Sequence, residues 1–211
     1  MKVCEIFTSI QGESTFAGVP CTFIRMSGCN MRCLYCDTVY AYEEGDELTE
    51  EEILDKVREA GLATVEITGG EPLLQPAICF LVKNLLDLGY RVLIETNGSQ
   101  DIEGLDRRAV IILDIKTPGS GMSGRARLSN LFLLKPEDEV KFVMTDRNDY
   151  EWSRSFLREH SLERVCKILF SPAFGMLDPR DLASWILEDK LEVRLNLQLH
   201  KYIHGPGTRA V

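Results

Sequence analysis

Three cysteines stand in one short segment of the chain, at Cys29, Cys33 and Cys36. Their spacing allows a single loop to present three thiolates to one metal centre. A structural zinc ion closes its tetrahedron with four protein ligands, whereas a 4Fe-4S cluster held by three cysteines keeps one iron open for another ligand. The segment therefore predicts a 4Fe-4S cluster, and a zinc site completed by a distant His or Cys is the alternative.

A second motif, Gly69-Gly70-Glu71, directly follows the predicted buried strand Thr64–Thr68. Glycines at the end of a strand let the backbone approach a ligand closely, and a glutamate after them can anchor an ammonium group. Taken alone, the segment also fits an ordinary turn before a helix, because prolines follow it. Its position one predicted strand after the three cysteines favours a ligand-binding loop over an ordinary turn.

The two motifs, in this order, resemble those of the radical S-adenosylmethionine (radical SAM) enzymes. The resemblance implies that the open iron binds the methionyl group of SAM and that the glycine-glutamate loop holds its amino group. It also implies that Tyr35 packs near the adenine. With polar residues at the ends of further predicted strands, the expected SAM site comprises Tyr35, Gly69, Gly70, Glu71, Thr96, Lys116, Ser120 and Ser171.

Further segments make the resemblance more specific. Gln11-Gly12-Glu13, Asp114–Pro118 and Gln198–Lys201 are similar to motifs of the 7-carboxy-7-deazaguanine synthase family, and the similarity covers nearly the whole chain. That family converts 6-carboxy-5,6,7,8-tetrahydropterin to 7-carboxy-7-deazaguanine with loss of ammonia, on the route to queuosine and related 7-deazapurines. The resemblance implies a radical derived from SAM that takes a hydrogen from C6 of the pterin, after which the ring contracts and SAM is regenerated.

The residue types suit such a substrate. Gln11 and Glu13 offer donors and acceptors to the edge of a pterin, Arg25 offers a planar fork for its carboxylate, and His200 is a further donor. Without the resemblance, a salt bridge for Arg25 and a polar turn for Gln11 and Glu13 would be the simpler interpretations. The expected substrate site comprises Gln11, Gly12, Glu13, Arg25, Gly70 and His200.

Thr38 lies two residues after the third cysteine and resembles the magnesium-binding threonine of the family. Mg²⁺ prefers oxygen ligands and keeps several waters, so one hydroxyl and a substrate carboxylate form a credible shell. The alternative is a threonine that caps the turn after the cysteine loop. The expected cofactors are a 4Fe-4S cluster, SAM and Mg²⁺.

Two positions depart from the family pattern. Ser14 stands where a glycine is common after Gln11-Gly12-Glu13, which bears on the flexibility of that loop. Gly207–Val211 follow Pro206, whereas some family members end close to the matching proline and use the terminal carboxylate in the site. No role of a terminal carboxylate is therefore transferred to this chain.

The composition is that of an ordinary soluble globular protein. The 211 residues are 45% hydrophobic and 27% charged, which predicts one domain over residues 1–211. No bilayer-spanning stretch and no secretory signal is apparent, so we expect a cytoplasmic protein. The formal net charge of -9 argues against nucleic acid as a partner. The resemblance implies a homodimer and an electron donor such as flavodoxin or ferredoxin.

Apolar runs alternate with helical patterns, which predicts an α/β fold with a parallel sheet. A complete eight-stranded barrel typically needs about 250 residues, so an incomplete TIM-like barrel with outer helices fits better. Predicted helices begin at the capping pair of Thr49 and Glu52, at Pro76, at Asn148 with Glu151, and at Asp178-Pro179. The predicted strands are Cys21–Met26, Thr64–Thr68, Arg91–Thr96, Ala109–Ile115, Glu139–Met144, Lys167–Ser171 and Glu192–Leu197.

Two other functions stay open at this point. A glycyl-radical-enzyme activase is also a small radical SAM protein, but it would have no use for Gln11-Gly12-Glu13 or for Gln198–Lys201. A non-enzymatic zinc-binding module is the alternative from a different class. Metal analysis separates the two kinds of site, because one contains iron with sulfide and the other a single zinc.

Overall fold

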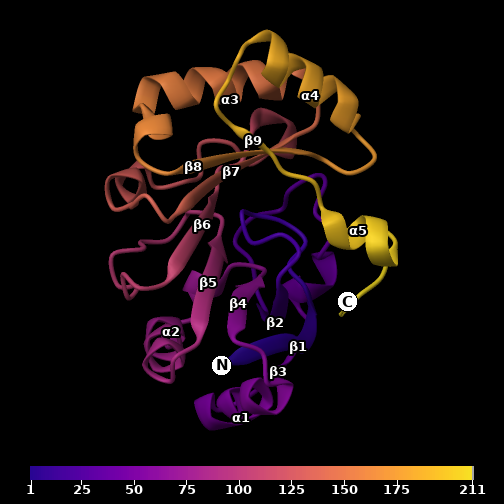
Figure 1. Cartoon of the computed structure of the whole chain (residues 1–211). Coiled ribbons are helices and arrows are strands. Elements are labelled where there is room, and N and C mark those ends of the chain that lie inside the picture. Colours follow the sequence, from indigo (N-terminus) through magenta and orange to yellow (C-terminus); the bar gives the residue numbers. More distant parts are fainter. Residues whose placement is uncertain (211) are drawn as a thin grey trace.

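The computed structural model describes residues 1–210, and one curved sheet organises them (Figure 1). Its strand order is β3-β1-β2-β4-β5-β6-β7-β8-β9, and the end strands β3 and β9 do not pair with each other. The strands from β2 to β9 run parallel, whereas β1 is antiparallel to both of its neighbours. The expected incomplete barrel is thereby confirmed. The strands are β1 (Lys2–Ile10), β2 (Pro20–Met26), β3 (Asp46–Glu47), β4 (Thr64–Gly69), β5 (Arg91–Thr96), β6 (Val110–Asp114), β7 (Glu139–Met144), β8 (Lys167–Pro172) and β9 (Arg194–Leu195).

Helices cover the outside of the sheet, and the last one lies on its open side between β9 and β1 (Figure 1). No helix within residues 1–210 is both long and apolar enough to cross a membrane. Short 3-10 helices occupy several of the loops. The α-helices are α1 (Glu50–Ala60), α2 (Ile78–Asp87), α3 (Arg147–His160), α4 (Pro179–Glu188) and α5 (Leu199–His204), and the 3-10 helices span Val39–Tyr42, Pro72–Leu74, Pro118–Ser120, Leu128–Phe132 and Leu162–Arg164.

The two faces of the sheet differ in polarity, because successive side chains of a strand point to opposite sides. On β4, Val65 and Ile67 belong to the apolar core, while Glu66 and Thr68 line the inner cavity. On β7, Phe142 belongs to the same core. The hydrophobic core thus lies between the sheet and the outer helices, and the inner face is free to carry polar residues.

The predicted starts of α1 and α4 are confirmed, whereas that of α3 is not. Thr49 and Glu52 form a capping box at the start of α1, and Gly61 ends it in a left-handed conformation with φ 68°. Asp178 caps α4 as expected. The predicted start of α3 at Asn148 is wrong, because Asp146 accepts a hydrogen bond from the backbone of Asp149 and the helix begins at Arg147.

Three further expectations need correction. The strands β1 and β3 are not among the predicted strands. The last strand, predicted as Glu192–Leu197, is only β9, and His200 lies on α5 instead of at a strand end. The helix predicted from Pro76 begins at Ile78 with Ala77 as its N-cap. The other predicted strands are confirmed within one residue at each end.

Candidate active site

One cavity of about 510 Å³ lies inside the curved sheet, where loops at the carboxyl ends of the strands meet α5. This is the rim at which parallel barrels carry their functional residues. Three predicted residues, Glu71, Ser120 and Ser171, do not reach its wall. The predicted residues that do line it are Gln11, Gly12, Glu13, Arg25, Cys29, Cys33, Tyr35, Cys36, Thr38, Gly69, Gly70, Thr96, Lys116 and His200.

The cysteine loop follows β2 and is packed directly against the loop after β4. The backbone N–H of Glu71 donates to the carbonyl of Gly28 at 2.8 Å. A Cβ at Gly70 would overlap that same carbonyl group and lie 3.0 Å from the Cβ of Cys29. Glycine is thus required at this position by the close approach of the two loops.

Glu71 ties these loops to the end of β5. Its carboxylate is fully buried and accepts hydrogen bonds from the hydroxyl of Thr96 (2.7 Å) and from the backbone N–H groups of Asn97 (2.7 Å) and Leu73 (3.0 Å). These hydrogen bonds fix the position of the loop, and the expected contact of Glu71 with SAM stays a prediction.

The thiols of Cys29, Cys33 and Cys36 are half-buried and line one wall of the cavity. Within residues 1–210, no three His, Cys, Asp or Glu side chains converge closely enough to hold a single metal ion. The three thiols are the donor set that would hold a 4Fe-4S cluster with one iron left for another ligand.

Lys116 supplies positive charge next to the thiols. It forms an ion pair with Asp114 at 2.9 Å and lines the cavity. Burial raises the pKa of the Cys33 thiol, and the Lys116 ammonium group opposes that shift. Because only thiolates bind iron, a lysine at this place favours the ligating form.

The remaining residues of the expected SAM site fall into two groups. Tyr35 and Thr96 lie on the cavity wall, and the Tyr35 hydroxyl donates to the carbonyl of Val143 at 3.3 Å. Ser120 and Ser171 are buried behind the wall. The Ser120 carbonyl accepts from the backbone of Leu34 at 3.0 Å, so this residue supports the cysteine loop from behind.

The loop after β1 meets α5 across the open side of the sheet. The backbone N–H of Leu199 donates to the carbonyl of Gly12 at 2.7 Å, and the side-chain amide of Gln198 donates to Glu13 at 2.9 Å. A Cβ at Gly12 would overlap the imidazole ring of His200. The close approach explains the glycine and places the expected substrate residues from both ends of the chain together.

Ser14 adopts the left-handed conformation, with φ 63°. A glycine adopts this conformation without cost, and a serine rarely does. The Ser14 side chain is buried, and its hydroxyl accepts a hydrogen bond from the backbone of Phe16 at 3.1 Å. At this position the serine thus combines a backbone conformation that favours glycine with a local hydrogen bond of its side chain.

Arg25 forms the salt bridge that the sequence suggests and also lines the cavity, where a substrate carboxylate is expected. Its Nε donates to Glu5 at 2.7 Å, and Glu5 also accepts from the hydroxyl of Tyr40 at 2.9 Å. The guanidinium group lies 5.6 Å from the centre of the Phe7 ring and lines the cavity. The ion pair thus fixes one edge of the guanidinium plane, and its terminal amino groups remain for a ligand.

Thr38 lines the cavity beside the third cysteine, with its hydroxyl 3.7 Å from the Cys36 sulfur. It precedes the 3-10 helix Val39–Tyr42, but its side chain makes no capping hydrogen bond. The alternative role as a turn cap is therefore not supported. Asp37 next to it forms an ion pair with Lys201 of α5 at 2.5 Å.

A group of buried charged residues on the inner face was absent from the sequence-based site. Lys141 of β7 contacts Glu13 at 2.9 Å, pairs with Glu95, and lies 3.6 Å from Asp114. Glu66 of β4 accepts a hydrogen bond from the amide of Gln11. Period-2 alternation within the apolar strands was the signal that could have placed these residues inside.

These surroundings give Glu13 and Glu66 different protonation states at neutral pH. Although burial opposes the shift, the Lys141 ammonium group lowers the pKa of Glu13 to about 2. Burial and the nearby Glu95 raise the pKa of Glu66 to about 8. Burial also lowers the pKa of His200, so its imidazole is neutral at pH 7. The inner face therefore holds an ionised acceptor, a neutral acid and a neutral imidazole.

The curved parallel sheet and the three-cysteine loop define a radical SAM protein, and the model of the Radical SAM superfamily matches residues 23–114. A protein named 7-carboxy-7-deazaguanine synthase from Koribacter versatilis (strain Ellin345) is 45% identical over 226 residues, covering 100% of both chains. One of the same name from Chlorobaculum tepidum is 46% identical over 214 residues, covering 100% of this chain and 97% of its own. The chain therefore belongs to the 7-carboxy-7-deazaguanine synthase family.

A solved structure supports the fold independently. The crystal structure of QueE from Escherichia coli matches with a TM-score of 0.77 over 94% of each chain, at 23% sequence identity. The structure of Streptococcus suis SuiB matches 83% of this chain and 48% of its own, with a TM-score of 0.58.

Proposed function

We propose that this chain is a radical SAM lyase that converts 6-carboxy-5,6,7,8-tetrahydropterin to 7-carboxy-7-deazaguanine with loss of ammonia, in 7-deazapurine and queuosine biosynthesis. The observation that carries the proposal is the shared cavity: the three thiols line it together with Gln11, Glu13, Arg25 and His200, which we call the second or substrate wall. A glycyl-radical-enzyme activase would not need this second wall. The named relatives, similar over the whole chain, support the same function.

Cys29, Cys33 and Cys36 would hold the 4Fe-4S cluster, and the loop around Gly70 would hold SAM against it. When bound, the two cofactors supply one-electron reduction and hydrogen-atom abstraction. The protein contributes position and charge: the cavity wall fixes the substrate beside the cofactors and limits the access of water.

The second wall suits a flat, polar bicyclic ring with one carboxylate. The terminal amino groups of Arg25 offer a planar fork to the carboxylate. Ionised Glu13 accepts from N–H groups of the pyrimidine ring, and the neutral His200 ring offers one donor or one acceptor. Thr38 would provide a hydroxyl ligand to Mg²⁺, which shares the substrate carboxylate and holds it in one pose.

We further propose the working context of the enzyme from its family and chemistry. All seven cysteines are free thiols, and a reduced cluster needs a reducing compartment, so the cytoplasm is the proposed location. A flavodoxin or ferredoxin would deliver the electron, and two copies of the chain would form a homodimer.

The decisive experiment is anaerobic reconstitution with iron and sulfide, followed by reaction with carboxytetrahydropterin, SAM and dithionite. We expect mass spectrometry to show 7-carboxy-7-deazaguanine and ammonia, with SAM not consumed in proportion to product. A protein that binds a full cluster and cleaves SAM but leaves the pterin unchanged would refute the proposed substrate. A protein that binds one zinc per chain and no iron would refute the enzyme class.

A further inference from the structure

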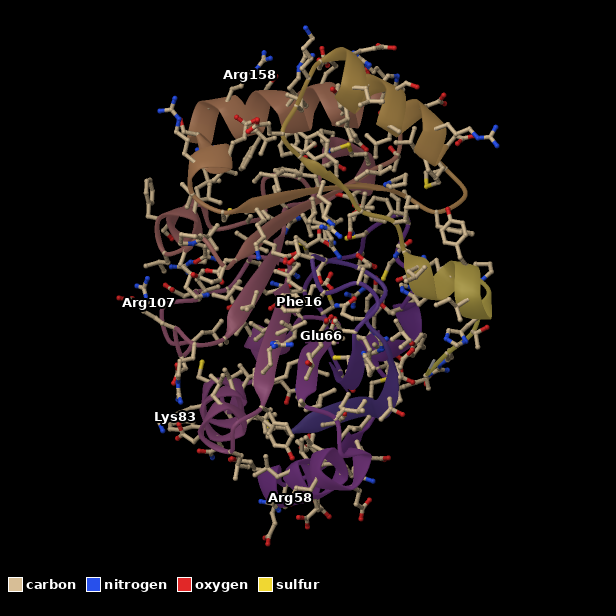
Figure 2. All side chains as sticks on the ribbon, viewed as in Figure 1. Phe16, Arg58, Glu66, Lys83, Arg107 and Arg158 are labelled. Carbon is tan, nitrogen blue, oxygen red and sulfur yellow. The ribbon has the colours of Figure 1, made fainter. Side chains whose placement is uncertain are left out.

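Glu66 is a buried acid that the expected site does not include. It lies in the middle of β4, is 2% exposed, and lines the cavity. Figure 2 shows it at the centre of the molecule, whereas the labelled Arg58, Lys83 and Arg158 point outward into solvent. A carboxyl group buried this deeply in a strand costs free energy unless it has partners, so its presence needs an explanation.

Only one of its two oxygens has a protein partner. The amide nitrogen of Gln11 donates to Oε2, and the amide oxygen of Gln11 accepts from the backbone N–H of Glu13 at 2.5 Å, which fixes the orientation of the amide. Over residues 1–210, no donor or acceptor reaches Glu66 Oε1. That oxygen is also not among the fully enclosed polar atoms without a partner, so it opens into the cavity.

Burial and the neighbouring acids favour the neutral form of Glu66, and Lys141 opposes it. Glu95 faces it from β5 and Glu13 from the loop after β1, while Lys141 faces it from β7 and the Cys21 thiol from β2. Burial and Glu95 together raise the pKa of Glu66 to about 8. At neutral pH the side chain is thus a neutral acid with an O–H group to donate.

We propose that Glu66 is a substrate-recognition residue, whose Oε1 hydrogen-bonds the pyrimidine edge of the pterin while Oε2 holds Gln11 in place. The inference rests on the proposed function, because a pterin carries a ring carbonyl beside N–H groups on that edge. The neutral acid donates to the carbonyl, next to Glu13, which accepts from an N–H group. A buried polar group that only the correct substrate can satisfy is an effective source of specificity.

Two substitutions separate this role from simple packing. Glu66→Gln keeps an acceptor for Gln11 and a donor for the substrate, whereas Glu66→Leu removes both. We expect Glu66→Gln to stay within about threefold of wild type, and Glu66→Leu to raise both the substrate Kd and KM at least about tenfold. Binding of the pterin is measured by anaerobic calorimetry on the reconstituted, SAM-loaded protein, and the affinity for SAM should be unchanged in both variants.

Glu139 provides the matched control. It is another fully buried carboxylate on the inner face, it accepts from the backbone and hydroxyl of Thr15, and it does not line the cavity. Glu139→Gln should bind the pterin as wild type does. Equal loss of affinity in Glu139→Gln and Glu66→Leu would reduce Glu66 to a packing role and overturn the proposal.

A pH series gives a second readout. The affinity of wild type for the pterin should fall above about pH 8 as Glu66 loses its proton, and Glu66→Gln should not share this fall. Wild-type affinity in Glu66→Leu, or identical pH curves for wild type and Glu66→Gln, would overturn the inference. If the wild type binds the pterin without converting it, the proposed reaction fails, but the role of Glu66 is still decided by the binding data.

Discussion

The three cysteines line the same cavity but have different neighbouring residues. Substituting each one in turn therefore tests a shared role against separate local roles. Cys29 accepts a hydrogen bond from the backbone of Met31 at 3.4 Å, and Cys36 lies beside Thr38. The ligand role predicts that loss of any one thiol removes the cluster, whatever its surroundings.

We predict that Cys29→Ala, Cys33→Ala and Cys36→Ala each bind little iron and give no turnover. The two thiolates that remain in each variant are too few to hold a 4Fe-4S cluster. Iron and sulfide analysis and the visible absorption spectrum measure the loss. Cys79→Ala is the matched control, since Cys79 is also half-buried but lies on α2 outside the cavity. A full cluster in any of the three variants would contradict the assignment.

Arg25→Lys tests the planar fork. Lysine keeps the charge but loses the Nε contact to Glu5 and the paired terminal amino groups, so we expect substrate affinity to fall about tenfold while SAM affinity stays the same. Calorimetry with each ligand measures the two affinities separately. Wild-type kinetics with the carboxypterin would confine Arg25 to its ion pair with Glu5.

Thr38→Ala tests the proposed magnesium ligand. The structure gives the hydroxyl no capping hydrogen bond, so we expect little change in stability and a clear change in the dependence of activity on Mg²⁺. Activity is measured against magnesium concentration after chelation, for wild type and variant. Full wild-type activity in chelator, or superimposable magnesium curves, would exclude the role.

At the scale of elements, the contact between the loop after β1 and α5 decides the shape of the substrate wall. Gly12→Ala places a methyl group against the His200 ring and 2.9 Å from the backbone nitrogen of that residue. We expect α5 to shift, with KM for the pterin rising at least about tenfold and cluster content unchanged.

The control for this variant is Gly207→Ala, because a Cβ there meets no atom within 4 Å. Its KM should equal that of wild type. An unchanged KM in Gly12→Ala would show that α5 does not need its present position for substrate binding.

The elements also show where sequence patterns suffice. Continuous apolar runs identified β4, β5 and β7, since fully buried parallel strands leave few other interpretations. The strand β1 was missed because it has no continuous buried apolar run: only Val3 is fully buried, and its other residues are half-buried or exposed. The start of α3 was misplaced because Asp146 competes with Asn148 as a cap, and only the backbone path decides between them.

In the site, too, some residues could be predicted from the sequence and others could not. Short-range motifs located the cysteines, Gly70 and the loop at Gln11, because spacing along the chain determines those contacts. Lys141 and Glu66 escaped notice because each stands alone in an apolar strand, and their partners come from distant strands. Glu71 fits its motif, but its carboxylate is directed into the protein by hydrogen bonds that sequence spacing does not reveal.

At the scale of the whole molecule, the buried acids give stability a distinctive dependence on pH. Glu66 has a pKa of about 8 in the folded chain, against 4.5 in the unfolded chain. Between these values the folded state binds a proton that the unfolded state lacks, so stability falls as pH rises, by at most about 1.4 kcal/mol per pH unit from this group.

Urea unfolding of the metal-free protein under reducing conditions, between pH 5 and pH 8, measures this fall. Glu66→Gln should have a smaller slope over the same range, because its side chain cannot lose a proton. Equal slopes in wild type and variant would mean that Glu66 is ionised in the folded protein. Glu13 acts in the opposite sense below pH 4.5, where protonation of its carboxylate weakens the pair with Lys141.

The contact of Glu13 with Gln198 joins residues 185 positions apart in the sequence. Contacts this distant form late, because the chain must lose much of its freedom before they can be made. During synthesis the cysteine loop leaves the ribosome long before α5 does. The substrate wall is therefore complete only after the last helix has been made and has reached its place against the loop after β1.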